Sequence, residues 1–286
     1  MIAGLAVGCV AQSDEIASDD AASQSDDISA TSRTYVVARS DGSGGYFVHD
    51  VNRATLNEKE VTGFDFSGAN LDADAIADAL GAADGELVLH GKLGPTDSHG
   101  KRAFLVTEAY RGMPGFTPTA GATYYFAAPR SPQIQCFTTP CNDEMSTKLN
   151  STTTKAFTSL DVTAATATRS DPAWLAAHAL DGGVVAGTFV KGAHEAGGYD
   201  SVLTASQVFV KLPVTEGACP QFIVDCGSQA ATYTRDANRC EIFASCVNHG
   251  PCSQLVPSCP AGYTLASWPS APNACPAFAC DPTFTE

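Results

Sequence analysis

Apolar and polar positions recur in one order in two successive parts of the chain, from about residue 35 to 111 and from about 124 to 211. Each part contains short stretches of β-branched and aromatic residues, then one stretch with helical spacing, then two longer β-like stretches. Equivalent positions lie 96 to 100 residues apart, and a nearly constant offset indicates an internal repeat. The paired landmarks are Asn52 with Asn150, Asp65 with Asp161, Leu80 with Leu180, Gly91 with Gly187, and Val106 with Leu203.

The first repeat is predicted to form five strands and one helix. Asp72 caps the helix because its carboxylate can accept a hydrogen bond from an amide of the first turn, and Asp74 adds a favourable charge there. Ile76 and Leu80 share one helix face, and Gly81 ends the helix. The predicted strands are 35–38, 46–51, 61–66, 86–93 and 103–110.

The second repeat carries the same signals. Asp171-Pro172 is a helix start, because proline at the first helical position lacks only an amide that would go unpaired anyway. Trp174, Leu175 and His178 follow, with His178 beside Trp174, and glycines at 182 and 183 end the helix. The predicted strands are 123–126, a stretch that ends at 150, 157–162, 184–190 and 201–210.

Three strands, a helix and two strands is the connectivity of the five-stranded oligonucleotide/oligosaccharide-binding (OB) barrel. The sequence therefore predicts a mainly β protein, with a minor α component, built from a tandem pair of OB-like barrels over 33–115 and 120–213. A pair of α+β sandwiches would contain the same elements and is the alternative.

The remainder of the chain lacks this periodicity. Residues 10–32 contain six acidic and no basic residues and no aromatic residue, which predicts a disordered acidic tether. Residues 1–9 resemble the end of a bacterial lipoprotein signal peptide, which implies lipidation of Cys9, although the basic region and the full apolar core are missing. The alternative is a short apolar N-terminus with an incidental cysteine.

Cysteine usage separates a third part, 217–286. Eight of the 11 cysteines lie there, among frequent proline, glycine and asparagine, which predicts a small module held by four disulfides in an oxidising compartment. Cys219-Pro220-x-Phe222 recurs as Cys275-Pro276-x-Phe278 and suggests two related loops, while the pairing among 105 possibilities stays open. Lipidation of Cys9 leaves ten cysteines to pair: Cys136, Cys141, Cys219, Cys226, Cys240, Cys246, Cys252, Cys259, Cys275 and Cys280.

The net charge of -15 argues against nucleic-acid binding, which normally requires a basic stripe, and against adsorption to anionic lipid. No apolar run approaches the roughly 18 residues of a membrane span. Contact with a membrane is therefore expected only through the lipid anchor, at the outer membrane or cell surface.

Two groups of residues resemble an uncharacterised domain of secreted lipoproteins from myxobacteria and related bacteria. They are Gly44-Gly45-Tyr46-Phe47-Val48 leading to Asn52, and Cys136-x4-Cys141 leading to Asn150. The resemblance implies an extracytoplasmic location and no chemistry. That family carries cysteines near the first glycine pair, where this chain has Ser43, so the first repeat lacks that disulfide. The tail resembles the eight-cysteine clusters that end some secreted bacterial proteins.

Candidate catalytic and metal sites all have simpler interpretations. No Cys-x-x-Cys appears, and His249 near Cys246 and Cys252 is the one mixed ligand set, so no metal or cofactor is predicted. His194-Glu195 lacks the second histidine of a zinc-protease helix and is expected in a solvated loop. Further candidates with no catalytic role expected are Ser43 between glycines, Asp72 and Asp74, His90, and the adjacent pair His49 and Asp50, which point to opposite strand faces.

The sequence thus predicts a non-enzymatic, lipid-anchored cell-envelope protein that binds a protein or glycan. A loop closed by Cys136 and Cys141 could present Phe137 to that partner. The alternative is a secreted protease inhibitor acting through the tail, since residues 233–243 resemble a stretch of Kunitz-type inhibitors, although Cys240 and Cys246 are too close for that family. An enzyme with a site assembled from distant residues is a third possibility.

Overall fold

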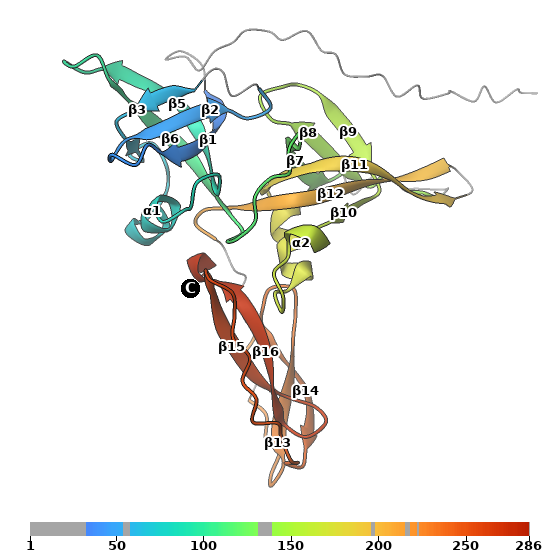
Figure 1. Cartoon of the computed structure of the whole chain (residues 1–286). Helices are drawn as coiled ribbons and strands as arrows, with labels where there is room; N and C mark the ends of the chain where they lie inside the picture. The colour runs from blue at the N-terminus through green and yellow to red at the C-terminus, as the bar shows by residue number, and fades with distance from the viewer. Residues whose placement is uncertain are drawn as a thin grey trace, which may run out of the picture.

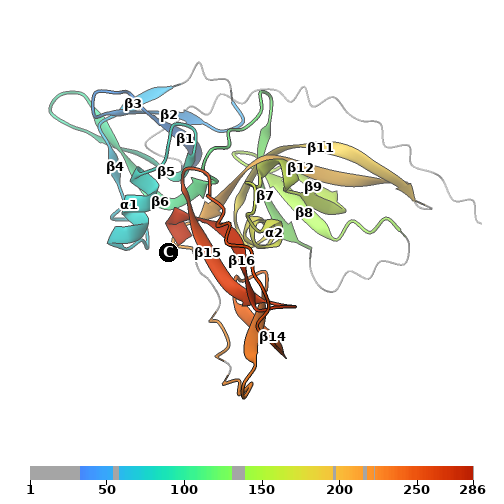
Figure 2. The same ribbon diagram turned by 60° about the horizontal axis from the view of Figure 1, so that its bottom comes forward.

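The computed structural model describes residues 33–53, 58–130, 139–195, 198–214, 218–221 and 223–285. These residues form a mainly β body and a narrow C-terminal projection, here called the finger (residues 218–285), which extends away from the body in both views (Figures 1 and 2). The predicted mainly β class and the disulfide-rich C-terminal region are confirmed. Cys9, Cys136, Phe137 and the proposed tether lie outside the described residues.

The first repeat forms seven elements and the second forms eight. The first contains β1 (Thr34–Ser40), β2 (Tyr46–Asp50), β3 (Lys59–Val61), β4 (Phe64–Asp65), α1 (Ala73–Leu80), β5 (Leu87–Thr96) and β6 (Arg102–Gly112). The second contains β7 (Thr123–Pro129), β8 (Glu144–Lys148), β9 (Thr154–Phe157), β10 (Ser159–Asp161), a 3-10 turn (Thr163–Ala165), α2 (Pro172–Leu180), β11 (Val184–Glu195) and β12 (Gly198–Lys211).

Both helices begin where the sequence predicts. The carboxylate of Asp72 accepts a hydrogen bond from the amide of Ala75 at 2.9 Å, and that of Asp171 accepts from Ala173 and Trp174. These aspartates satisfy amides that have no partner within the helix. The capping chemistry therefore fixed both helix starts.

The two closed OB-like barrels are not confirmed. The third predicted strand of each repeat is divided: β3 pairs antiparallel with β2, whereas β4 pairs in parallel with β6, and β9 and β10 divide likewise between β8 and β12. The bend between β3 and β4 is itself bonded to the β6 region, because the Thr62 amide donates to the Arg102 carbonyl and the Phe104 amide to the Gly63 carbonyl, so the sheet of the first repeat curls back on itself. Alternation of apolar residues identified the strand but could not show that its two halves lie at opposite ends of a curled sheet.

One sheet of 12 strands runs through both repeats. Its order is β3-β2-β1-β5-β6-β12-β11-β7-β8-β9, with β4 and β10 added on β6 and β12. The repeats meet where β6 and β12 pair antiparallel, with Arg111 opposite Val210. Because the order reads the same from either end, the body has an approximate twofold axis at this pair. Helices α1 and α2 lie on the side nearest the finger (Figure 1).

A reciprocal pair of asparagines ties the repeats together. Asn52 and Asn150 have positive φ angles of 63° and 54°, which asparagine tolerates better than most residues. Asn52 accepts from the amide of Tyr124 at 2.7 Å and donates to the carbonyls of Tyr124 and Leu149. Asn150 makes the equivalent bonds to the first repeat: it accepts from the amide of Tyr35 at 2.8 Å and donates to the carbonyls of Tyr35 and Val51. We call this arrangement the asparagine clasp.

Two apolar clusters flank the sheet. The larger cluster lies under both helices and reaches Tyr263, Cys280 and Phe284 of the finger. The smaller cluster lies on the opposite face and draws on both repeats, with Val37, Val88 and Tyr110 from the first, and Leu149, Val184 and Phe209 from the second. Neither repeat can bury this second face alone.

The strand registers correct one paired landmark. Phe104 pairs with Leu93 and Leu203 pairs with Phe189, so Val106 is equivalent to Ala205 rather than Leu203. A shift of two residues keeps every side chain on the same face of a strand, so alternation cannot exclude it. The Gly91–Gly187 equivalence holds, because both glycines sit at a register shift where a Cβ would collide with a carbonyl of the next strand.

The finger consists of two hairpins, β13 (Ala230–Arg235) with β14 (Glu241–Val247), and β15 (Tyr263–Ser270) with β16 (Cys275–Pro282), followed by a 3-10 turn (Thr283–Thr285). Four disulfides join Cys219 to Cys240, Cys226 to Cys246, Cys252 to Cys275, and Cys259 to Cys280. Each hairpin thus carries two bridges, with no bridge between the hairpins.

Candidate functional site

Each hairpin of the finger is preceded by one segment without regular structure that is fixed at both ends. The ends of segment 219–226 are joined to the two ends of β14 through Cys240 and Cys246, and those of segment 252–259 are joined to β16 through Cys275 and Cys280. We call these two segments the finger loops. Their bridges hold them alongside a strand without requiring their other side chains to pack.

The finger loops are related in sequence and in exposure. They read CPQFIVDC and CSQLVPSC, with cysteine at both ends, glutamine third, and two apolar residues in the centre. Every position described in both loops has the same burial class. Ile223 is fully exposed, Leu255 is 85% exposed and Val256 is 68% exposed, while Phe222 lies outside the described residues. Two loops of one pattern therefore present apolar side chains to solvent.

The predicted relation between the two CPxF motifs is wrong. Cys219 opens the first finger loop, whereas Cys275 starts β16 and occupies the third cysteine position of its hairpin. The signal that identifies the true repeat is the equal spacing of Cys219 to Cys226 and of Cys252 to Cys259, together with the shared glutamine.

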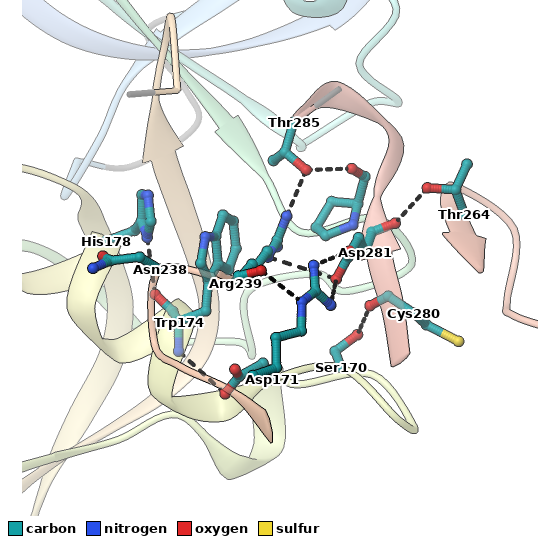
Figure 3. Close-up of polar contacts among 12 residues, drawn as sticks. Ser170, Asp171, Trp174, His178, Asn238, Arg239, Thr264, Cys280, Asp281 and Thr285 are labelled. Carbon is teal, nitrogen blue, oxygen red and sulfur yellow. Dashed lines mark hydrogen bonds and ion pairs between the residues drawn. The ribbon is translucent and has the colours of Figure 1, made fainter. Parts of the chain in front are cut away.

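Arg239 fixes the finger to the second repeat (Figure 3). Its guanidinium lies 3.5 Å from the ring centroid of Trp174 on α2, and its Nη1 donates to the Thr285 hydroxyl at 2.6 Å. Asp281 lies between Arg239, at 3.6 Å, and Arg235, which donates two hydrogen bonds to it at 3.0 and 2.6 Å. Arg239 and Asp281 are both buried. These are a stacked cation and a bidentate ion pair with little access to water.

Backbone contacts add to this attachment of the finger to the body, which we call the finger seat. The amide of Cys280 donates to the carbonyl of Arg169 at 3.0 Å, and the hydroxyl of Ser170 donates to the carbonyl of Cys280 at 2.8 Å. On the first repeat's side, the Tyr263 hydroxyl donates to the carbonyl of Pro114 at 3.2 Å, and burial raises the pKa of Tyr263. The finger is therefore held by side chains and backbone from both halves of the body.

A family profile described as a domain of unknown function, DUF6748, matches residues 34–215, which are the two repeats of the body. The chain belongs to the DUF6748 family. An uncharacterised protein of Dictyostelium discoideum is 28% identical over 247 residues, covering 82% of this chain and 81% of the relative. That coverage exceeds the DUF6748 range, so the similarity extends beyond the body. No solved structure matches.

The DUF6748 body also contains a titratable cluster where its repeats meet. His90 Nδ1 lies 3.2 Å from the Thr107 hydroxyl and 3.3 Å from Glu108, and its ring stacks on Tyr35. Burial lowers the pKa of His90, which also faces Arg33 and Lys211. Burial alone would raise the pKa of Glu108, but hydrogen bonds from Lys211 at 2.7 Å and from Tyr110 lower it. Because Lys211 comes from the second repeat, this cluster serves to join the repeats.

Other candidates from the sequence have structural surroundings. In the described ranges, no three His, Cys, Asp or Glu side chains gather to hold a metal. The ring of His178 lies 4.2 Å from that of Trp174, as predicted. The expected solvated loop at His194 is wrong, because His194 lies in β11 and its ring meets that of Tyr199 across the β11–β12 hairpin. Cys141 is disulfide-bonded, although its predicted partner is not described.

The Kunitz-like stretch 233–243 forms the turn of the first finger hairpin. Its central Arg239 is packed on the DUF6748 body, so this turn cannot enter a protease cleft while the finger is seated. None of the helices in the described part of the chain is both long and apolar enough to cross a membrane. The four disulfides indicate an oxidising, extracytoplasmic environment.

Proposed function

We propose that this chain is a non-enzymatic, lipid-anchored protein of the cell envelope that binds another protein through its finger loops. Cys9 carries the lipid in this proposal, and the two-repeat body is the base that presents the finger. The observation that carries the proposal is the exposure of Ile223, Leu255 and Val256 on two loops of one pattern. Exposed apolar groups at matched positions are typical of contact surfaces.

The disulfides strengthen this interpretation. A loop that is fixed at both ends loses little conformational freedom when it binds, so more of its contact energy is available as affinity. Packing of the finger does not require the side chains of Ile223, Leu255 and Val256, because all three are exposed. A partner with an apolar groove would cover these side chains, as interface anchors are covered in other complexes.

The test is affinity capture from a cell-envelope extract with the full chain as bait. Leu255→Asp should abolish recovery of the specific partner without lowering thermal stability, because the side chain is exposed. Ser258→Asp is the matched control, since the first loop already carries Asp225 at the equivalent position, and it should retain the partner. Equal recovery by all three proteins would exclude the finger loops as the contact surface.

Protease inhibition is the second candidate, and one observation favours it. A substrate-like inhibitor needs an exposed, irregular loop fixed at both ends, and residues 252–259 have this form with Leu255 at the centre. Stoichiometric inhibition of a protease that cleaves after large apolar residues would support it. Leu255→Lys should then transfer inhibition to a protease that cleaves after basic residues. Cleavage of the chain without inhibition would exclude this candidate.

A further inference from the structure

The first repeat contains a small cavity that is separate from the finger. It has a volume of about 170 Å³ and lies between the end of α1, β1, β2 and β4. The residues that matter for its chemistry are Arg39, Ser40, Tyr46, Phe64, Leu80 and Asp84. Pockets that hold drug-sized ligands are usually about 300–1,000 Å³, so this one has room for a single small ring.

One wall of the cavity is aromatic and apolar. The rings of Tyr46 and Phe64 lie 4.4 Å apart and are tilted by 43°, and both are only half-buried. Leu80 adds an aliphatic surface that is 46% exposed. Aromatic faces carry partial negative charge, which attracts the weakly positive C–H groups on the face of a sugar ring.

The rim of the cavity is polar and carries unused hydrogen-bonding capacity. Asp84 accepts from the amide of Ser40 at 2.8 Å through Oδ1, while its Oδ2 and the Tyr46 hydroxyl make no hydrogen bond to any residue that the structure describes. Arg39 is neutralised by Glu58, which accepts its two hydrogen bonds at 2.9 and 2.7 Å. The charge left at the rim is therefore the carboxylate of Asp84.

The second repeat supplies an internal comparison. By strand register, the positions of Arg39, Ser40, Tyr46 and Phe64 are taken there by Ala128, Pro129, Glu144 and Leu160. The equivalent strands of the second repeat thus form without the aromatic wall. Tyr46 and Phe64 pack against the core in part, and a ligand would explain why the first repeat has an aromatic pair at these positions.

We propose that this cavity binds one ring of a neutral hexopyranose. The aromatic wall fits the C–H face of the ring, and the Asp84 carboxylate can accept hydrogen bonds from two neighbouring hydroxyls. The same carboxylate would repel an acidic sugar. This site lies apart from the finger loops, so its failure would leave the proposed protein contact standing, and the reverse also holds.

The test is saturation-transfer NMR on the full chain with glucose, galactose, mannose and N-acetylglucosamine, and with glucuronate as the anionic comparison. We expect transfer to the ring protons of at least one neutral sugar and less transfer to glucuronate. Phe64→Leu should weaken binding about fivefold by removing the ring contact, and Asp84→Asn about tenfold by removing the charge. Asparagine retains an acceptor for the Ser40 amide, and leucine is the residue that the second repeat already carries, so both variants should fold.

Phe189→Leu is the matched control. It replaces an aromatic residue of the second repeat with the residue found at the equivalent position of the first, Leu93, and should leave sugar binding unchanged. Absence of transfer to all four neutral sugars would overturn the proposal. So would equal binding by the wild type, Phe64→Leu and Asp84→Asn.

Discussion

The asparagine clasp shows how two side chains can join the repeats of this body. Each asparagine occupies a backbone conformation that most residues avoid, and each uses both its carbonyl and its amide group on the backbone of the other repeat. The side chain and the conformation therefore act together. The sequence showed that these asparagines are equivalent, but it could not show that they contact each other's repeat.

We expect Asn52→Ala to lower the free energy of unfolding by about 2–4 kcal/mol, because three hydrogen bonds are lost and alanine is strained at a positive φ. Asn52→Gly should lose less, since glycine accepts this φ without strain. Chemical denaturation measures both variants. The exposed Asn70→Ala serves as the control and should change stability little.

A second residue-scale prediction concerns pH. Burial lowers the pKa of His90 below its ordinary value of 6.5, so the unfolded chain binds more protons than the folded chain just below pH 6.5. The contribution of His90 to the free energy of unfolding is then fully present above about pH 6.5. It falls on acidification by at most about 1.4 kcal/mol per pH unit. Burial lowers the pKa of His49 as well, so it adds in the same direction.

His90→Gln should flatten the pH dependence of the unfolding free energy between pH 7 and 5, because glutamine does not titrate. The exposed His99→Gln is the control and should keep the wild-type slope. An unchanged slope in His90→Gln would show that this ring does not govern acid sensitivity. Denaturant titrations at several pH values give the slopes.

At the scale of elements, local chemistry was predictable and long-range pairing was not. Asp72 and Asp171 identify both helix starts because capping acts within three residues. The division of 61–66 and 157–162 into two strands each depends on partners far away in the chain, which alternation does not specify. The cysteine count predicted a module held by disulfides. The regular pairing within it is indicated only by the equal spacing of Cys219 to Cys226 and of Cys252 to Cys259.

The finger seat gives a prediction at this scale. Arg239→Ala leaves Trp174 uncovered and removes one of the two cations beside the buried Asp281, so we expect the finger to loosen from the body at a cost of about 3–5 kcal/mol. Hydrogen exchange should rise in the Arg169–Ser170 segment and in β16, while β1 and β5 stay protected. Arg130→Ala, in an exposed contact, should leave exchange in both regions unchanged.

The disulfide pairing in the finger can be tested by removing one bridge. Each bridge spans 20 to 23 residues, for which the loop-closure relation gives about 3 kcal/mol of stabilisation. Replacing Cys252 and Cys275 together by serine should therefore release the second finger loop while leaving the first hairpin intact. Peptide mapping without reduction should recover the remaining three finger bridges, and a reshuffled set would contradict the assigned pairing.

For the whole molecule, the approximate twofold axis means that each repeat is completed by the other. The second apolar cluster and the β6–β12 pairing both require two halves, and an unpaired β6 edge would invite association. The strands of the two repeats lie within the predicted ranges 33–115 and 120–213, and the shared sheet makes the repeats interdependent.

Residues 33–115 expressed alone should therefore not remain a folded monomer. Because the contact surface of a twofold arrangement is the same on both sides, we expect this fragment to form a homodimer that pairs β6 with β6. Light scattering after size-exclusion chromatography gives the mass. A stable monomer with native circular dichroism would show that the halves are independent.

The matched finger loops have a consequence for valency. A partner with two apolar grooves at the right spacing could engage both loops at once, and the second contact would then form at the high local concentration set by the first. The seat and the bridges leave the loops little freedom to adjust that spacing. Such a finger would discriminate between partners by the distance between their grooves as well as by the chemistry of each one.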